Sequence, residues 1–313
     1  MDGYKRAAPP PSGMRIGVLG AGSMGSLFAG LLAARETETV LFARESDHVA
    51  ALRESGLRVV HADGTAETVD VPVVCDPGAA PRCDYVLVCV KSYQTDDALA
   101  TWAGAFGDAA VATLQNGLGN AEALAAYVPE ERVLAGATSH GAHVPEPGVV
   151  RHAGRGDTRL GSYFALNDAN VRALATQLSL AGIETHVVDD VRRAIWRKAL
   201  VNVGINAATA LAGVENGALA ATAPGTRLVR RSVAEAARVA RHEGVDTEGV
   251  IEETLTVARR TASNVSSMRQ DVEAGRETEV EAIHGAVVSR AEDAGLPAPV
   301  NRTLADLVRL ADA

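Results

Sequence analysis

Hydrophobic positions along this 313-residue chain change their spacing at about residue 189. Before that point, short apolar runs alternate with stretches of helical period, and continuous apolar runs are typical of buried parallel strands. The runs that predict strands span residues 15–19, 39–43, 57–61, 68–74, 85–90, 110–115 and 132–138. Helices are predicted at residues 26–34, 48–55 and 96–103, and this alternation favours a doubly wound, mostly parallel sheet.

A glycine-rich turn joins the first predicted strand to the first predicted helix. Residues 20–25 read GAGSMG, the G-x-G-x-x-G spacing of a dinucleotide-binding turn. Gly20 makes the tight turn, Gly22 lets the backbone approach a pyrophosphate, and Gly25 lets the helix pack closely on the strand. The helix N-terminus then offers free N–H groups to phosphates. A glycine-rich turn that binds no ligand is the alternative, but the strand-turn-helix context favours a Rossmann domain.

After residue 189 the strand-like runs stop and Ala-rich stretches of helical period follow, separated by Gly and Pro. They predict helices at residues 191–212, 227–243, 247–262, 278–294 and 302–311. We therefore predict an α/β N-terminal Rossmann domain, residues 14–188, and an all-α C-terminal domain, residues 189–313. Residues 1–13, with three consecutive prolines, are expected to form a disordered tail.

Composition narrows the classes of function. The formal charge of −9 argues against nucleic acid as a main partner. No apolar run is long enough for a membrane span, and residues 1–13 lack the apolar segment of a signal peptide. Cys75, Cys83 and Cys89 form neither a C-x-x-C pair nor a zinc-like cluster. We expect a cytoplasmic protein without a structural metal.

The end of the second predicted strand bears on the choice of cofactor. Arg44 stands where an NAD site usually has Asp or Glu, and a guanidinium suits a 2′-phosphate, so NADP is favoured over NAD. Glu45 follows directly and keeps NAD open as the alternative, as does a solvated Arg44. Lys91 and Asn116 each follow a central strand, where a dinucleotide crevice opens, although a strand-end lysine and an Asn-Gly turn are equally ordinary.

One helix of the second region carries a polar row. Lys198, Asn202 and Asn206 recur every four residues on an otherwise apolar stretch, so they share one helix face. A carbonyl reductase needs such a row, because an ammonium can protonate the oxygen on which charge grows during hydride addition. A solvated helix face is the alternative reading.

Together these motifs resemble the ketopantoate reductase (2-dehydropantoate 2-reductase) family, from Met14 to about Leu310. In the first half, the matching motifs are residues 20–25, 88–94 (VCVKSYQ) and 115–119 (QNGLG). The second half adds residues 196–202 (WRKALVN), 205–206 (IN), 216–217 (NG), 264–268 (NVSSM) and 277–279 (ETE).

The resemblance implies that NADP(H) delivers a hydride to the keto carbon of 2-dehydropantoate, a small 2-oxo acid, in pantothenate biosynthesis. It implies that Lys198 is the general acid and that Glu279 holds the substrate hydroxyl. The implied substrate-binding residues are Asn116, Asn202, Asn206, Asn216, Asn264 and Ser267. The implied cofactor-binding residues are Gly20, Ala21, Gly22, Ser23, Met24, Gly25, Arg44, Lys91 and Asn116.

Two positions depart from the family pattern. His284 stands where Asn is frequent, and Ala207 follows Asn206 where Pro is common. A reductase of another branched 2-oxo acid on the same scaffold therefore stays open, as does a non-catalytic NADP(H)-binding regulator. A homodimer through the Ala-rich helices is a further option that the sequence leaves open.

Overall fold

The computed structural model describes residues 13–312, so the predicted tail lies outside the described residues apart from Gly13. The described chain packs as two compact units. The first unit holds residues up to Val90 together with Asp96–Leu114 and Leu124–Asp189. The second holds the residues from Asp190 onward and two short segments, Lys91–Thr95 and Gln115–Ala123. The sequence did not predict that these two segments, each of which follows a strand, pack with the helices.

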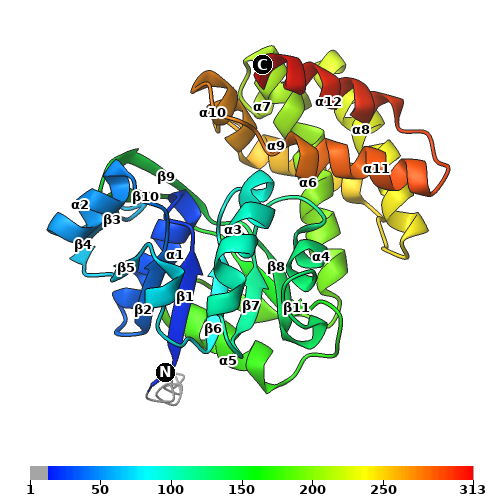
Figure 1. Cartoon of the computed structure of the whole chain (residues 1–313). Helices are drawn as coiled ribbons and strands as arrows, with labels where there is room; N and C mark the ends of the chain where they lie inside the picture. The colour runs from blue at the N-terminus through cyan, green and yellow to red at the C-terminus, as the bar shows by residue number, and fades with distance from the viewer. Residues whose placement is uncertain (1–12, 313) are drawn as a thin grey trace, which may run out of the picture. The chain divides into compact units, whose positions relative to one another are not determined.

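An eight-stranded sheet forms the centre of the first unit, in the order β12-β11-β8-β7-β6-β1-β2-β5 (Figure 1). Every neighbouring pair is parallel except β8 and β11, which confirms the predicted mostly parallel sheet. Its strands are β1 (Arg15–Leu19), β2 (Glu38–Phe42), β5 (Val73–Val74), β6 (Tyr85–Val88), β7 (Ala110–Thr113), β8 (Val133–Thr138), β11 (Thr158–Ser162) and β12 (Thr185–Val187). The four residues of β6 and of β7 are all buried, as expected for central parallel strands.

A second, smaller sheet was not predicted. It has the strand order β4-β3-β10-β9, with β3 (Leu57–Val60), β4 (Ala66–Val69), β9 (Gly141–Glu146) and β10 (Val149–Gly154). The single strand predicted over residues 68–74 is wrong, because Pro72 and the residues before it separate β4 from β5, and the two strands belong to different sheets. β3 and β4 pair around the predicted Asp63-Gly64 turn.

Helices of the chain's first 189 residues follow their strands closely. They are α1 (Ser23–Ala33), α2 (Asp47–Ser55), α3 (Thr95–Trp102), α4 (Asn120–Ala125) and α5 (Ala169–Leu180). Short 3₁₀ turns are η1 (Pro77–Ala79), η2 (Ser92–Gln94), η3 (Ala103–Ala105) and η4 (Glu130–Arg132). Helix α1 buries Leu27, Phe28 and Leu32 completely, so the turn before it is anchored on a packed core.

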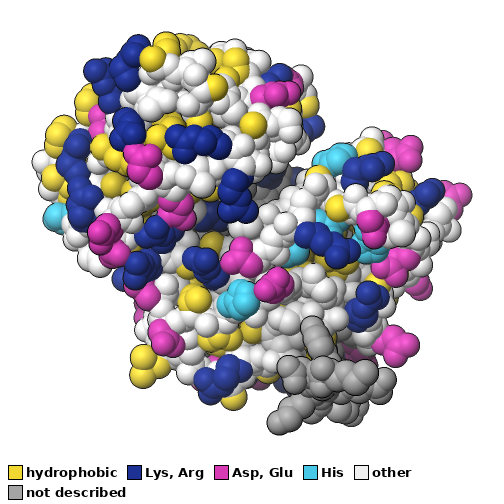
Figure 2. Space-filling view, turned by 180° about the vertical axis from the view of Figure 1, so that it is seen from behind, with side chains coloured by type: hydrophobic (Ala, Val, Ile, Leu, Met, Phe, Trp, Pro, Cys, Tyr) yellow, Lys and Arg dark blue, Asp and Glu magenta, His cyan; other side chains and the backbone are white. Residues whose placement is uncertain are grey.

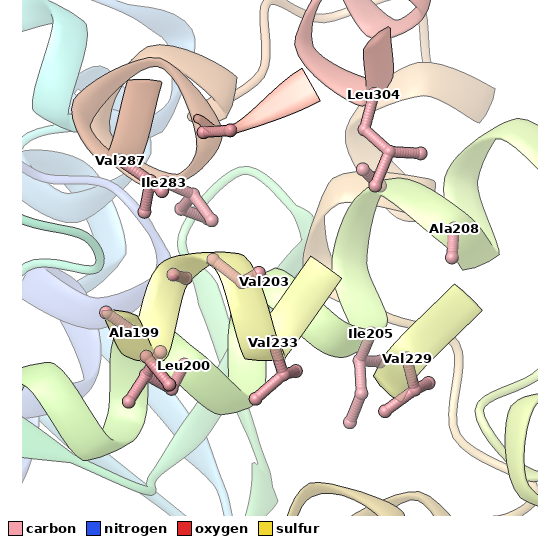
Figure 3. Packing of buried hydrophobic residues seen from close by; sticks show 14 of the residues in the cluster. Ala199, Leu200, Val203, Ile205, Ala208, Val229, Val233, Ile283, Val287 and Leu304 are labelled. Atoms are coloured by element: carbon pink, nitrogen blue, oxygen red, sulfur yellow. The ribbon is translucent and has the colours of Figure 1, made fainter. Parts of the chain in front are cut away.

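The second unit is built from helices, as predicted. They are α6 (Val191–Ala212), α7 (Gly217–Ala221), α8 (Ala223–His242), α9 (Val250–Arg260), α10 (Ser267–Glu273), η5 (Glu281–Gly285, one π-helical turn), α11 (Ala286–Asp293) and α12 (Pro299–Asp312). Asp190 caps the start of α6 by accepting a hydrogen bond from the Arg193 backbone, and Gly213 ends it in the left-handed conformation. Figure 3 shows side chains of α6, α8, η5, α11 and α12 gathered in the core of this unit.

The surface carries both signs of charge. On the face drawn in Figure 2, Lys and Arg side chains are interspersed with Asp and Glu side chains. Within residues 13–312, no helix combines the length and the apolar character that crossing a bilayer requires.

Candidate active site

The turn between β1 and α1 has three glycines with three different constraints. Gly20 has φ +108°, and a Cβ there would lie 2.8 Å from the Val90 side chain. A Cβ on Gly25 would overlap the carbonyl oxygen of Gly20, so the turn closes only with glycine at that position. A Cβ on Gly22 would meet nothing within 4 Å. The space beside Gly22 is therefore open to a ligand that approaches the backbone.

Helix α1 begins at this turn with Gly22 as its N-cap, and no side chain within the described chain caps it. Its first N–H groups therefore carry the partial positive charge that attracts phosphate. Because Ser23, Met24 and Gly25 supply these groups, the geometry fits a dinucleotide pyrophosphate. Sequence reasoning placed the helix start at Ser26, three residues late.

Two residues that sequence reasoning missed brace the turn. The Ser26 hydroxyl donates to the Ala21 carbonyl at 3.2 Å and lies 3.0 Å from His48 Nε2. His48 Nδ1 accepts a hydrogen bond from the Gly148 backbone N–H at 3.0 Å. A neutral ring with Nδ1 as acceptor carries its proton on Nε2, so His48 donates to Ser26. Burial lowers the pKa of His48, which favours this neutral form.

The end of β2 lies beside the same turn, because the Gly20 N–H donates to the Phe42 carbonyl at 2.8 Å. Arg44, two residues beyond β2, has an exposed side chain. Glu45 is held by Arg53 of α2 through two hydrogen bonds of 2.9 and 2.8 Å. This part of the first unit thus presents the exposed guanidinium of Arg44 beside a carboxylate that Arg53 already pairs.

Glu279 is the centre of a polar group in the second unit. This residue is only 8% exposed. It accepts a hydrogen bond from Asn116 Nδ2 at 3.0 Å and another from the Ser92 N–H at 3.2 Å. Asn116 and Glu279 are 163 residues apart in sequence, and the structure brings them together.

A backbone contact fixes the loop that carries Asn116. The Leu118 N–H donates to the Ala282 carbonyl of η5 at 2.8 Å. Gly117 has φ +87°, and a Cβ there would overlap that same carbonyl, so this position requires glycine. The π-helical turn that follows Glu279 therefore holds the Asn116 loop in place beside the Glu279 carboxylate.

Lys198 lies within the electrostatic influence of Glu279. Its half-buried side chain projects from α6, and burial lowers its pKa to about 8, although the Glu279 carboxylate opposes this shift. A lysine with such a pKa is mostly protonated at neutral pH, yet it releases its proton far more readily than an exposed lysine. These are the properties of a general acid.

Lys91 has a different partner. Its ammonium lies 2.6 Å from Asp271 Oδ2, and Arg276 lies 3.1 Å from Oδ1 of the same buried carboxylate. Burial alone would lower the Lys91 pKa, but the carboxylates of Glu279 and Asp271 outweigh it and raise the pKa. Sequence reasoning missed Asp271, although it stands four residues after Ser267 on α10, where the two side chains share a helix face.

The remaining predicted residues lie on α6 and near α10. Asn202 is half-buried and Asn206 is 6% exposed, and both share the α6 face of Lys198. The Asn216 N–H donates to the Asn264 carbonyl at 3.1 Å, and Asn216 Nδ2 donates to Thr261 at 2.9 Å. The Asn216 side-chain oxygen is buried without a hydrogen-bond partner.

Neighbouring serines at the start of α10 have separate roles. Ser266 is buried and caps the helix, whereas Ser267 is exposed, as is Asn264. Among residues 13–312, no hydrogen bond joins Asn216, Asn264 or Ser267 to Glu279. The structure thus groups Glu279 with Asn116, Lys91 and Lys198, and links this group to α10 through the Lys91–Asp271 ion pair.

The two departures from the family pattern are core positions. His284 is fully buried, its Nδ1 lies 2.9 Å from Asn301 Oδ1, and burial lowers its pKa to about 4. Ala207 is fully buried too. Neither side chain is accessible to a dissolved substrate in this structure. The substitutions therefore give no direct evidence of a different substrate.

No group of three or more His, Cys, Asp or Glu side chains in the described part of the chain is placed to hold a metal ion. The open space beside Gly22 and the free N–H groups of α1 fit the pyrophosphate of a dinucleotide.

Comparison with known proteins covers nearly the whole chain. Residues 16–164 match the family model described as ketopantoate reductase PanE/ApbA, and residues 190–312 match its C-terminal model. The 2-dehydropantoate 2-reductase of Halobacterium salinarum is 54% identical over 299 residues, which are 95% of this chain and 99% of the relative.

Solved structures are similar over nearly the whole chain as well. A PanE/ApbA family ketopantoate reductase from Ralstonia eutropha JMP134 has a TM-score of 0.88 at 33% identity, and the match covers 96% of this chain and 98% of the other. The ternary structure of D-mandelate dehydrogenase with NADH and anilino(oxo)acetate has a TM-score of 0.88 at 27% identity, again over 96% and 98% of the chains. The chain therefore belongs to the PanE/ApbA ketopantoate reductase family, whose members are oxidoreductases.

Proposed function

We propose that this protein reduces 2-dehydropantoate to pantoate with NADPH, a step of pantothenate biosynthesis. The observation that carries the proposal is the position of Lys198 near the Glu279–Asn116 pair within one compact unit. A 2-oxo acid that also bears a hydroxyl needs a proton donor and a hydroxyl acceptor. Lys198 and Glu279 supply these two functions with side chains whose electrostatics are coupled.

Lys198 acts as the general acid. Bound NADPH supplies the hydride that adds to the keto carbon of the substrate. As that bond forms, the keto oxygen gains negative charge, and the Lys198 ammonium stabilises the charge and then transfers a proton to the oxygen. The products are the secondary alcohol and NADP⁺, and Lys198, left neutral, takes a proton from solvent before the next turnover.

Glu279 accepts a hydrogen bond from the substrate hydroxyl. Its carboxylate already accepts two hydrogen bonds, from Asn116 and Ser92, and an ionised carboxylate has further lone pairs available. The same carboxylate raises the Lys198 pKa, so it also keeps the acid protonated at neutral pH.

Amide and hydroxyl groups bind the rest of the substrate. Asn202 and Asn206 extend the Lys198 face of α6, and the exposed side chains of Asn264 and Ser267 can bind the substrate carboxylate and hydroxyl. Residues with substrate-binding roles are Asn116, Asn202, Asn206, Asn216, Asn264 and Ser267.

The first unit binds the cofactor. The turn from Gly20 to Gly25 binds the pyrophosphate through the backbone at the start of α1. Exposed Arg44 binds the 2′-phosphate by charge-assisted hydrogen bonds, and this contact selects NADPH over NADH. In the second unit, Lys91 adds a positive charge that two carboxylates keep protonated.

A reductase of another branched 2-oxo acid is the second candidate. It is favoured by the similarity to D-mandelate dehydrogenase, whose solved structure contains NADH and anilino(oxo)acetate. The test is the kcat/KM of the purified protein for 2-dehydropantoate and a panel of branched 2-oxo acids, each with NADPH and with NADH.

We expect the highest kcat/KM for 2-dehydropantoate with NADPH. A higher kcat/KM for another oxo acid would support the second candidate. Tight NADPH binding without turnover of any oxo acid would contradict both and indicate a non-catalytic regulator.

A further inference from the structure

The loop after β2 holds two residues of opposite charge side by side in sequence. Arg44 suits the 2′-phosphate of NADP, whereas a carboxylate in this region suits the free 2′-hydroxyl of NAD and repels a phosphate. Glu45 is such a carboxylate, and its side chain is 66% exposed. Something must therefore offset its charge if the site is to accept a phosphate.

The structure shows what offsets it. Arg53, in the last turn of α2, binds both oxygens of Glu45 at 2.9 and 2.8 Å. Both bonds come from one nitrogen, Nη1, which lies between the two carboxylate oxygens and pairs their charge. Arg53 also lies 3.1 Å from Cys75, which directly follows β5, the strand next to β2. Glu45 is thereby held toward α2 and β5.

Protonation cannot be what neutralises Glu45. Hydrogen bonds from Arg53 and then from Cys75 lower the pKa of its carboxyl, so it is ionised at neutral pH. Only a paired positive charge is left to cancel it, and Arg53 provides that charge. Arg44 is thus not needed for this pairing.

We propose that Arg53 is a positioning residue for cofactor specificity: it binds Glu45, and so leaves Arg44 as the charge that a 2′-phosphate meets. The proposal rests on the proposed use of NADPH. It assigns the preference to a set of three residues, Arg44, Glu45 and Arg53, rather than to Arg44 alone. Arg53 acts through Glu45 and does not itself contact the cofactor.

The test measures dissociation constants for NADPH and NADH without substrate, from the fluorescence of the bound reduced nicotinamide. Loss of Arg53 in Arg53→Gln frees an unpaired carboxylate, so NADPH binding should weaken by roughly two- to fivefold, the scale of an exposed ion pair. NADH binding should stay unchanged or tighten, and the ratio of the two constants should fall. The double variant Glu45→Gln/Arg53→Gln should restore the wild-type ratio.

Asp47 supplies the matched control. It is exposed, ionisable and two residues beyond Glu45, and Arg53 does not bind it. The double variant Asp47→Asn/Arg53→Gln has the same net charge as the rescued variant, but it should keep the lowered ratio. Arg53→Lys retains the charge but lacks the second nitrogen, Nη2, through which Arg53 contacts Cys75, so its ratio should lie between wild type and Arg53→Gln. If Arg53→Gln does not fold, the ratio of dissociation constants measured for Arg53→Lys tests the proposal instead.

Three results would overturn the proposal. An unchanged ratio in Arg53→Gln would show that Glu45 does not influence the cofactor. Failure of Glu45→Gln to rescue would show that Arg53 binds the phosphate itself. Equal rescue by the Asp47 variant would show a general charge effect. Each result is a change in the ratio of the two dissociation constants, so it does not depend on which cofactor the wild type prefers. A wild-type preference for NADH would contradict only the proposed use of NADPH.

Discussion

The pKa of Lys198 gives a quantitative prediction for the pH dependence of the reaction. Burial lowers this pKa to about 8, and the protonated form is the one that can donate to the keto oxygen. Ketone reduction should therefore be fastest below pH 8 and should slow as the pH rises through that value. An ordinary lysine, with a pKa of about 10.4, would keep its proton throughout this range.

The size of the effect follows from the fraction of protonated lysine. With a pKa of about 8, about 90% of Lys198 is protonated at pH 7 and about 10% at pH 9. The value of kcat/KM should thus fall about tenfold between these two pH values, and about tenfold for each further pH unit. Replacing the acid in Lys198→Ala should cost about 100- to 10,000-fold, the usual contribution of a positioned general acid.

Glu279 should shift the profile, because its negative charge raises the Lys198 pKa. In Glu279→Gln the negative charge that raises the Lys198 pKa is lost, so this pKa should drop further. The fall in kcat/KM should then begin at a lower pH than in wild type. Glu281→Gln is the matched control: it removes a carboxylate two residues away that is paired with Arg309, and it should leave the position of the profile unchanged.

The assay is the loss of NADPH absorbance with 2-dehydropantoate from about pH 6 to about pH 10. A deuterated cofactor run in parallel shows, through its isotope effect, whether hydride transfer limits the rate at each pH. A flat profile combined with a full isotope effect would refute the assignment of Lys198 as the acid. A fall at the same pH in wild type and Glu279→Gln would refute the electrostatic coupling.

Further predictions concern the cofactor turn, the 2′-phosphate and the buried histidine. Gly25→Ala should lower the melting temperature because its Cβ overlaps the turn, at a cost of about 1–3 kcal/mol, whereas Gly22→Ala should melt normally but lose NADPH affinity, as calorimetry of both variants would show. Arg44→Gln should weaken NADPH binding by about 10- to 100-fold and change NADH binding little, which titration calorimetry with each cofactor measures. The pKa of His284 is about 4 in the folded protein, below its ordinary value of about 6.5. Above pH 6.5 the histidine is neutral in both states and costs no stability. As the pH falls from 6.5 toward 4, the unfolded state takes up the proton first, and the free energy of unfolding drops by up to about 3 kcal/mol. Urea unfolding should accordingly show a smaller acid loss in His284→Asn than in wild type, and equal losses would contradict the buried neutral histidine.

Local patterns were sufficient for the elements that bury a continuous apolar surface. The helix predicted over residues 191–212 is α6, with a capping aspartate at one end and a left-handed glycine at the other. Central strands β1, β6 and β7 were also predicted, because strands buried on both faces appear as uninterrupted apolar runs.

Elements at the edges were missed for a physical reason. Strands β9 and β10 are partly exposed, and β9 contains a proline, so neither forms an apolar run. They join the small sheet through the pairing of β10 with β3, a contact between distant segments that no local pattern records. The π-helical turn η5 was predicted as part of a regular helix over residues 278–294, since it has the same apolar spacing.

The active-site residues divide in a similar way. The turn from Gly20 to Gly25 and the polar row on α6 are local patterns, and the sequence alone predicted both. The pairing of Glu279 with Asn116, and of Lys91 with Asp271, joins residues 163 and 180 positions apart. The role of Glu279 came from the resemblance to the family, and Asp271 was not predicted at all.

The most direct test of the proposed reaction follows the hydride itself. The protein is incubated with 2-dehydropantoate and NADPH that carries deuterium at the transferred position of the nicotinamide, and the product is examined by NMR and mass spectrometry. The proposed function predicts pantoate with one deuterium on the carbon that bore the keto group and none elsewhere. Oxidation of NADPH without deuterium in pantoate, or no oxidation despite tight NADPH binding, would contradict it.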